Sequence, residues 1–335
     1  MTSPPYYGLR DYGTATWIGG DPNCNHRRDT KVKPENCNTG HKNHDDMAGV
    51  GDAIYKTVCP KCGAIRQDSQ IGLEQTPEDY VKEMVKVFSL VRDCLTDDGT
   101  LWLNIGDSYY NYRSDGNYPK QTVSKTRQDL PQSTPVRGNK LEGLKQKDLI
   151  GIPWMLAFAL RADGWYLRQD IIWHKPNPMP ESVKDRCTKA HEYIFLLSKS
   201  KNYYYDNEAI KEPAKDWGTR DRTNGKYHNP GSGLAPHSGL TKSYSTKNKR
   251  SVWSVTVKPY KGAHFATYPE ELVEPCILAG SEKGDIVLDP FMGSGTTAMV
   301  AKKNSRSYLG CELREEYASL QTARISSIPN KLPLY

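Results

Sequence analysis

Apolar residues recur along the chain with two spacings, each typical of one kind of secondary structure. In residues 77–95 they return every three or four positions, as on the buried face of a helix, and Thr76 is the expected N-cap. In residues 100–105, TLWLNI, they run almost without interruption, which predicts a buried strand that ends before Gly106. The same patterns predict helices at residues 152–162, 270–279 and 296–303, and strands at residues 166–173, 193–198, 285–289 and 307–313.

Strands that alternate with helices predict an α/β protein with a mainly parallel sheet. The 335 residues suffice for one large domain with insertions or for two modest domains. Residues 20–63 and 211–262 are polar and lack a clear apolar period, so we expect both to be insertions into one domain.

Composition narrows the class of protein. No apolar run approaches the roughly 18 residues that a membrane-spanning helix needs, and no signal peptide opens the chain, which argues against a membrane protein and against secretion. We therefore expect a cytoplasmic protein whose eight cysteines are reduced, so that clustered cysteines indicate metal ligands before disulfides. The net charge of +7 suits a nucleic-acid partner but does not establish one.

A glycine-rich loop follows the predicted strand 285–289. The segment 290–297, PFMGSGTT, leads into a helix, and its glycines let a ligand approach the backbone and the free N–H groups of that helix. Glu312 ends the next predicted strand, near the interval of about 20 residues at which an acidic side chain reaches ribose hydroxyls. A dinucleotide and S-adenosylmethionine both fit this pattern, a P-loop is disfavoured because no Gly-Lys-Ser/Thr follows, and a tight turn without a ligand is the remaining alternative.

The chain opens with a second motif, Ser-Pro-Pro-Tyr at residues 3–6. The Ser3 hydroxyl and the Pro4 carbonyl can accept both hydrogens of a nucleobase amino group, Pro5 stiffens the loop, and Tyr6 can stack on a base taken out of the duplex. This chemistry needs no covalent nucleophile. Taken alone, the same four residues are also typical of a turn or of a proline-rich ligand.

Together the two motifs resemble those of the amino-group DNA methyltransferases, which methylate adenine N6 or cytosine N4. The resemblance covers most of the chain, and the opening residues 7–12 are similar to those of phage- and prophage-borne members. The catalytic motif comes first and the cofactor motif last, which is the order of the β class, a circular permutation of the usual fold. Further similar blocks are residues 173–180 (WHKPNPMP), 191–198 (HEYIFLLS), 264–269 (HFATYP) and 309–313 (LGCEL).

The resemblance implies a circularly permuted Rossmann-like, S-adenosylmethionine-dependent methyltransferase fold with two insertions. The expected division is a catalytic half at 1–19 and 64–210, a target-recognition region at 211–262 and a cofactor-binding half at 263–335. Residues 20–63 are the zinc-binding insertion that the cysteine and histidine spacing described below predicts. The implied catalytic residues are Ser3, Pro4, Pro5 and Tyr6. The implied cofactor-binding residues are His264, Phe265, Asp289, Phe291, Gly293, Gly295, Thr296 and Glu312.

Within this family, serine before Pro-Pro-Tyr favours cytosine N4, with adenine N6 as the alternative. Protein glutamine or RNA as the acceptor, and an inactive zinc-bearing DNA-binding protein, are more distant alternatives. A β-strand normally precedes the catalytic loop, whereas here Met1 directly precedes Thr2. Either the chain as given starts too late to include this strand, or the sheet lacks a central strand at this position.

Cysteine and histidine residues in the first insertion have the spacing of a zinc site. Cys59 and Cys62 form a Cys-x-x-Cys-Gly knuckle that suits one tetrahedral ion, and Cys24 with His26 can complete a Cys₃His set. Four protein ligands leave no open position, so we expect a structural ion. Cys37, His41 and His44 are competing ligands.

A Pro-Cys pair at residues 275–276 has another interpretation, because cytosine-C5 methyltransferases attack the base with such a thiolate. Cys276 lies inside a predicted apolar helix, so we expect a buried, unreactive cysteine.

The stretch from Arg222 to Lys261 holds eight basic and no acidic residues, which indicates contact with DNA phosphates, and Trp253 lies among them. A solvated loop with incidental charge is the alternative. We expect duplex DNA as the partner and no membrane, and a homodimer is left open. The candidate DNA-binding residues are Lys175, Arg222, Lys242, Lys247, Lys249 and Arg250.

Overall fold

The computed structural model divides into two compact units. Unit 1 comprises Met1–Pro4, Val85–Gly106 and Pro153–Tyr335, and unit 2 comprises Pro5–Met84 and Asp107–Ile152. The residues that the structure describes are 1–8, 15–26, 58–67, 70–110, 141–214, 245–258 and 268–328.

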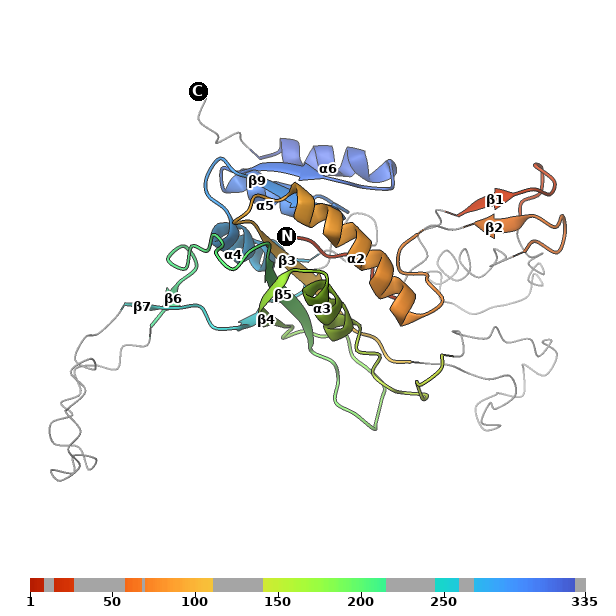
Figure 1. The fold of residues 1–335 in the computed structure, drawn as a ribbon, viewed down its shortest axis with the longest axis horizontal. Helices are drawn as coiled ribbons and strands as arrows, with labels where there is room; N and C mark the ends of the chain where they lie inside the picture. The colour runs from red at the N-terminus through yellow and green to blue at the C-terminus, as the bar shows by residue number, and fades with distance from the viewer. Residues whose placement is uncertain are drawn as a thin grey trace, which may run out of the picture. The chain divides into compact units, whose positions relative to one another are not determined.

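A four-stranded mixed sheet of order β3-β5-β4-β8 forms the centre of unit 1 (Figure 1). Strands β3 (Thr100–Ile105) and β4 (Tyr166–His174) each pair antiparallel with β5 (His191–Ser198). Strand β8 (Val252–Ser254) pairs parallel with β4. The sequence did not predict β8, and its Trp253 is 6% exposed and lies in the core instead of facing DNA.

Residues 1–3 connect this sheet to a second, parallel pair of strands, β9 (Ile286–Asp289) and β10 (Ser307–Gly310). Thr2 forms a parallel bridge with Leu103 of β3, since its N–H donates to the Trp102 carbonyl at 3.0 Å. On the other side, the Met1 nitrogen lies 3.4 Å from the Leu288 carbonyl of β9. Residues 1–3 therefore lie between β3 and β9, at the position where the sequence left open whether a central strand is missing, and they join the four-stranded sheet to the two-stranded sheet β10-β9.

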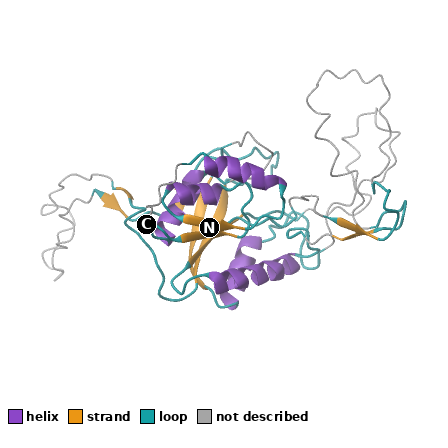
Figure 2. Cartoon of the chain, turned by 90° about the horizontal axis from the view of Figure 1, so that it is seen from above, coloured by secondary structure: helices purple, strands orange, loops and turns teal. Residues whose placement is uncertain are grey.

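Helices lie on both sides of the strands, as Figure 2 shows. One face of the sheet packs against α4 (Glu270–Gly280) and α5 (Thr296–Lys303), with Trp102, Leu196 and Trp253 in that core. On the other face, α3 (Ile152–Ala162) brings Trp154 into edge contact with Phe195 at 5.1 Å between ring centroids. Alternate residues of a strand point to opposite faces, which explains how these near-continuous apolar strands fill two cores.

Helix α2 (Pro77–Cys94) begins as its sequence predicts. The Asp79 N–H donates to the Thr76 hydroxyl at 3.1 Å, so Thr76 is the N-cap. The Ser89 hydroxyl donates to Asp163 at 2.8 Å, which joins α2 to the turn after α3. All the predicted helices and strands are present with small shifts of their ends, except that β10 ends at Gly310, three residues early. There the chain turns and brings Glu312 back to the glycine loop.

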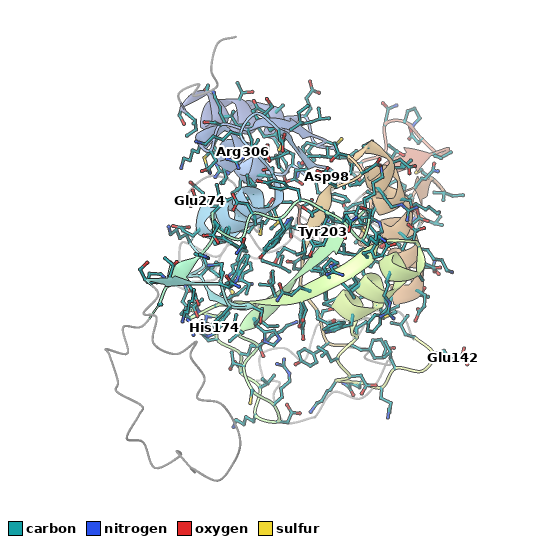
Figure 3. All side chains as sticks on the ribbon, turned by 60° about the vertical axis from the view of Figure 1, so that its left-hand side comes forward. Asp98, Glu142, His174, Tyr203, Glu274 and Arg306 are labelled. Atoms are coloured by element: carbon teal, nitrogen blue, oxygen red, sulfur yellow. The ribbon has the colours of Figure 1, made fainter. Side chains whose placement is uncertain are left out.

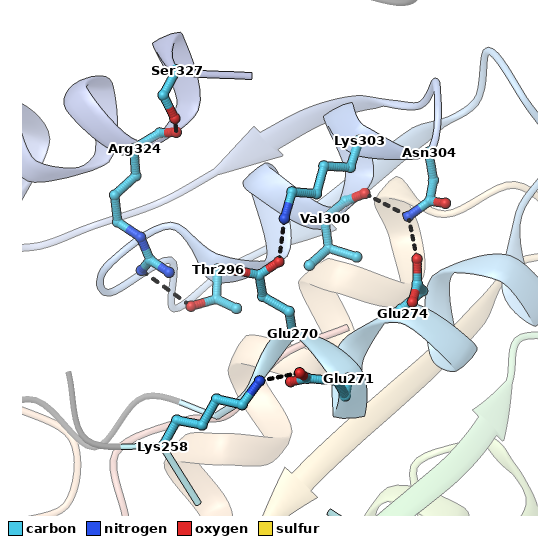
Figure 4. Close-up of polar contacts among 10 residues, drawn as sticks. All are labelled: Lys258, Glu270, Glu271, Glu274, Thr296, Val300, Lys303, Asn304, Arg324 and Ser327. Atoms are coloured by element: carbon cyan, nitrogen blue, oxygen red, sulfur yellow. Dashed lines mark hydrogen bonds and ion pairs between the residues drawn. The ribbon is translucent and has the colours of Figure 1, made fainter. Parts of the chain in front are cut away.

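Polar contacts connect the last helices of unit 1 (Figure 4). Lys303 of α5 pairs with Glu270 of α4, and the Asn304 amide donates to Glu274 at 3.4 Å. Helix α6 (Glu316–Ser326), which the sequence did not predict, contributes Arg324, whose guanidinium donates to the Thr296 hydroxyl at 3.3 Å. Short antiparallel strands β6 (Glu212–Pro213) and β7 (Thr246–Lys247) complete the unit as described.

In unit 2 a small antiparallel hairpin is formed by β1 (Thr16–Ile18) and β2 (Ile65–Gln67). Its strands are joined through the segment that contains Cys24, His26, Cys59 and Cys62, called the cysteine cluster below. Across both units, none of the helices that the structure describes is apolar over the length needed to cross a membrane.

Candidate active site

The candidate catalytic and cofactor residues of unit 1 gather at one edge of its sheet. Asp289 ends β9, Ser3 follows the bridge at Thr2, and both segments run in the direction of β3 and β10. Glu192 lies at the start of β5, which is antiparallel, so it faces the same edge. Ligands of open α/β sheets bind beyond the carboxyl ends of the parallel strands, and this edge is therefore the expected site.

The glycine loop between β9 and α5 has backbone angles that favour glycine. Gly293 has φ of 50° and Gly295, the N-cap of α5, has φ of 79°. A Cβ on Gly293 would meet only the Phe291 carbonyl, at 3.9 Å, so the space beside this residue is open. The loop thus offers an exposed backbone at a helix N-terminus, as a polar ligand requires.

Glu312 lies directly against this loop. One carboxylate oxygen accepts the Gly293 N–H at 2.8 Å and the other accepts the Arg314 N–H at 3.0 Å. A carboxylate has about four acceptor sites, so the side chain held in this way can still accept the hydroxyls of a ribose. The open glycine turn and the adjacent carboxylate fit the adenosyl part of S-adenosylmethionine.

Asp289 is buried beneath the loop, with 1% of its surface exposed. Its carboxylate accepts hydrogen bonds from Thr2 and Thr297, both at 2.6 Å, from Tyr268 at 3.0 Å and from the Phe291 N–H at 3.0 Å. Burial, followed by the negative charge of Asp289, raises the pKa of Tyr268 well above its usual range. With four protein donors on its carboxylate, Asp289 fixes the loop from below.

The other predicted cofactor residues occupy different positions. Phe291 is half-buried and meets Phe88 edge-on, with ring centroids 6.4 Å apart. Thr296 is buried under the loop, where its hydroxyl accepts from Arg324. His264 and Phe265 lie outside the described residues.

A chain of polar side chains leads from Ser3 into the sheet. The Asn104 amide nitrogen lies 3.3 Å from the Ser3 hydroxyl and 3.3 Å from one Glu192 oxygen. The other Glu192 oxygen pairs with the Lys175 ammonium, which also lies 4.3 Å from the ring centroid of Trp173. Because an ionised carboxylate only accepts, Glu192 fixes which end of the Asn104 amide faces it, and Asn104 therefore donates to Ser3.

The remaining residues of the Ser-Pro-Pro-Tyr loop differ in exposure. Pro4 is buried, and among the described residues no donor reaches its carbonyl oxygen. In unit 2, the Pro5 carbonyl accepts the Tyr80 hydroxyl at 2.8 Å. Tyr6, also in unit 2, is partly exposed.

The candidate DNA-binding residues are only partly described. Arg222 and Lys242 lie outside the described residues. Arg250 and Lys247 flank Glu212, at 2.6 and 3.6 Å, and Lys249 lies 5.0 Å from the ring centroid of Trp253. Lys175 is largely buried against Glu192, which makes it a better candidate for positioning than for phosphate contact.

Cys276 is buried in α4, as its sequence context predicts, with 1% exposure. Burial raises the pKa of its thiol to about 12, so it carries no thiolate near neutral pH. His174, at the end of β4, has Nδ1 3.0 Å from the Ser254 hydroxyl, which orients the end of the strand (Figure 3).

In unit 2 the four predicted metal ligands come together. The ligand atoms of Cys24, His26, Cys59 and Cys62 all lie within 4.8 Å of one another. The competitors Cys37, His41 and His44 lie outside the described residues.

The sequence patterns did not indicate several residues of the site. Asn104 was detectable in principle, because it is the one polar side chain near the end of an otherwise apolar strand. The roles of Thr2, Glu192 and Tyr268 depend on contacts between distant segments. From α6, Gln321 donates to the Gly293 carbonyl at 2.7 Å and so supports the glycine loop.

The strand order and the two loops at its carboxyl edge define the circularly permuted Rossmann-like methyltransferase fold. The DNA methylase family model, which describes N6 and N4 methyltransferases, matches residues 1–323. The Type II methyltransferases M.Cfr9I of Citrobacter freundii and M.SmaI of Serratia marcescens are 41% and 42% identical over 97% of this chain, covering 80% and 82% of their own lengths. Among solved structures, the cytosine-N4-specific PvuII DNA methyltransferase superposes with a TM-score of 0.49 at 17% identity, covering 77% of this chain and 73% of its own. The chain belongs to this family of S-adenosylmethionine-dependent, amino-group DNA methyltransferases.

Proposed function

We propose that this methyltransferase is site-specific and transfers a methyl group to the N4 amine of cytosine in duplex DNA, with adenine N6 as the alternative. The observation that carries the proposal is the Ser3 hydroxyl, held by Asn104 at the carboxyl edge of the sheet that also bears the glycine loop. Serine before Pro-Pro-Tyr favours cytosine within the family. The Type II relatives support site specificity, and their bacterial origin supports a cytoplasmic location.

The exocyclic amine of a base is a poor nucleophile because its lone pair is delocalised into the ring. The Ser3 hydroxyl and the Pro4 carbonyl accept its two hydrogens and favour a pyramidal nitrogen. Asn104 donates to Ser3 from the other side and so fixes the direction of the remaining lone pair. S-adenosylmethionine, when bound, would supply an electrophilic methyl group and leave as S-adenosylhomocysteine, and the amine releases one of its two hydrogens as a proton to solvent.

The methyl donor is proposed to lie on the glycine loop. Glu312 accepts the ribose hydroxyls while its other contacts hold the loop in place. Phe291 offers an apolar surface beside the loop, and Asp289 and Thr296 act from beneath it. His264 and Phe265 remain candidates by family resemblance.

The target base must leave the duplex to reach Ser3, and Tyr6 is proposed to stack on it. Residues 211–262 are proposed as the target-recognition region, with basic side chains on DNA phosphates. The proposed phosphate contacts are Arg222, Lys242, Lys247, Lys249 and Arg250.

Product analysis tests this function directly. The purified protein is incubated with methyl-labelled S-adenosylmethionine and, in separate reactions, duplex DNA, RNA and a protein mixture. Labelled DNA is digested to nucleosides and analysed by mass spectrometry, with Ser3→Ala as the matched inactive control. The expected product is N4-methylcytosine at a small set of sequence contexts.

The other products decide between the alternatives. N6-methyladenine would replace cytosine by adenine as the target and leave the amine chemistry intact. Label in RNA or protein but not in DNA would reject DNA as the acceptor. The appearance of 5-methylcytosine would overturn the mechanism, because carbon methylation requires a thiolate and the buried Cys276 does not supply one.

A further inference from the structure

The cysteine cluster of unit 2 has the dimensions of a tetrahedral metal site. Zinc–sulfur bonds of about 2.3 Å and zinc–nitrogen bonds of about 2.0–2.1 Å place tetrahedral ligand atoms about 3.8 Å (S···S) and about 3.5 Å (S···N) apart. The sulfurs of Cys24 and Cys59 are 3.7 Å apart, and the Cys62 sulfur lies 3.5 Å from His26 Nδ1. A disulfide would instead bring two sulfurs to about 2.05 Å.

The backbone from Cys59 to Ala64 forms a hydrogen-bonded turn that holds Cys59 and Cys62 close together. The Cys59 N–H donates to the Ala64 carbonyl, and the Gly63 N–H donates back to the Cys59 carbonyl, both at 2.8 Å. Gly63 makes this turn with φ of 74°. Gly20 lets the opposite segment approach, since a Cβ there would lie 2.8 Å from the Cys62 sulfur.

His26 is held in an unusual conformation that directs its ring at the cysteines. Its φ of 50° lies in the left-handed region, which is costly for a residue other than glycine. The ring stacks on Trp17 at 4.3 Å between centroids, with an interplanar angle of 18°. Together the backbone angle and the stacked ring direct Nδ1 of His26 at the Cys62 sulfur, as a metal ligand requires.

The hairpin around the cluster has almost no apolar core. Among residues 15–26 and 58–67, which the structure describes, only Cys59 and Ala64 are buried. Ile18, Val58 and Ile65 are 56%, 50% and 59% exposed. An isolated hairpin is at best marginally stable in water, so this segment needs another source of stability.

We propose that Cys24, His26, Cys59 and Cys62 bind one structural zinc ion that holds this hairpin together. Three thiols lose their protons on binding, His26 ligates through neutral Nδ1, and the four protein ligands leave no coordination position for a substrate. The ion also links His26 to Cys59 across a long connection. A metal that closes a long loop stabilises the folded state most, because the closure entropy grows with loop length. The site is independent of methyl transfer.

Metal analysis of the full-length protein tests this proposal. Protein purified without chelator should contain one zinc per chain by elemental analysis, and a thiol-blocking mercurial should release it. Cobalt added after zinc removal should give the visible absorption of a tetrahedral thiolate site. Wild-type protein that contains no zinc and takes up no cobalt in this form would overturn the proposal.

Variants locate the ligands. Cys59→Ser and Cys62→Ser should lose the zinc, whereas the exposed control Cys94→Ser should keep it in full. His26→Cys should retain the metal and shift the cobalt spectrum towards four sulfur ligands. Calorimetric binding of S-adenosylmethionine, which reports on unit 1, shows that unit 1 of each variant is folded. Zinc retained in full by Cys59→Ser would exclude this set of ligands.

Discussion

The Thr2 hydroxyl donates a buried hydrogen bond of 2.6 Å to Asp289, although the two residues are 287 positions apart in the sequence. Thr2 directly precedes the Ser-Pro-Pro-Tyr loop, and Asp289 directly precedes the glycine loop. The bond therefore joins the residues that directly precede the two loops, on neighbouring segments of the chain. It links the proposed amine site to the proposed methyl-donor site.

Removing this hydroxyl should destabilise unit 1. Thr2→Val keeps the shape of the side chain but leaves Asp289 one donor short, and hydrogen bonds to charged groups contribute about 1.5–3 kcal/mol. Urea unfolding followed by tryptophan fluorescence measures the loss. Thr16→Val, which removes an exposed hydroxyl, is the control and should change stability much less. Equal effects of the two substitutions would show that the bond to Asp289 does not stabilise the fold.

Glu312→Gln should weaken binding of S-adenosylmethionine. The amide replaces a charged acceptor by a weaker one and presents a donor to one of the two N–H groups, of Gly293 or Arg314, that the carboxylate accepts, so we expect a loss of about 1–3 kcal/mol. Titration calorimetry measures the affinity, and Glu315→Gln, which changes an exposed carboxylate nearby, is the matched control. An affinity unchanged by Glu312→Gln would remove this residue from the site.

The sequence predicted the parts of this site that depend on local pattern. Thr76 caps its helix, and the apolar segments 100–105 and 296–303 form the expected strand and helix, because spacing and capping act over a few residues. The glycine loop was also predicted from its sequence, since its backbone angles at Gly293 and Gly295 require glycine.

The parts that could not be predicted depend on contacts between distant segments. Lys175 was among the candidate DNA-binding residues, and its ion pair with Glu192 could not be predicted from the sequence. Trp253 was assigned to a basic surface, whereas pairing of β8 with β4 takes it into the core. No spacing along the chain indicates either partner.

Cys276 should behave as an inert thiol. Its pKa of about 12 in the folded protein lies above its ordinary value of 9.0, so the folded chain keeps the proton while the unfolded chain releases it. The stability contribution is thus complete below pH 9 and declines as the pH rises from 9 to 12. Cys276→Ala should flatten the fall in unfolding free energy over this window, as measured by urea unfolding at several pH values.

The same thiol should resist alkylation in the native protein. Iodoacetamide at pH 8, followed by peptide mass spectrometry, should modify the exposed Cys94, Cys187 and Cys311 and leave Cys276 unmodified until the protein is unfolded. Cys276→Ala should retain methyl transfer. Rapid native labelling of Cys276 together with loss of activity in the variant would contradict its structural role.

Tyr6→Ala should reduce methylation while leaving the affinity for S-adenosylmethionine intact. Aromatic stacking contributes about 1–3 kcal/mol per base, which corresponds to a loss of about 5- to 160-fold in kcat/KM. Tyr6→Phe should have a mild effect because the ring face remains. DNA with a mismatch at the target should bind more tightly, since its base leaves the stack more easily. Equal losses in the two variants would assign the effect to the hydroxyl and not to stacking.

Asn104 is the residue through which the sheet should control the Ser3 hydroxyl. Asn104→Leu removes the donor that lies 3.3 Å from both Ser3 and Glu192, and misplaced reacting groups cost on the order of 100-fold in rate. Single-turnover kinetics should therefore show a lower rate of methyl transfer, with binding of S-adenosylmethionine unchanged by calorimetry. Glu192→Gln should have a smaller effect in the same direction, because its amide can still accept from Asn104 but no longer fixes the direction of that amide. If Asn104→Leu lowers stability and leaves the transfer rate at its original value, Asn104 serves packing alone and the control of Ser3 must come from elsewhere.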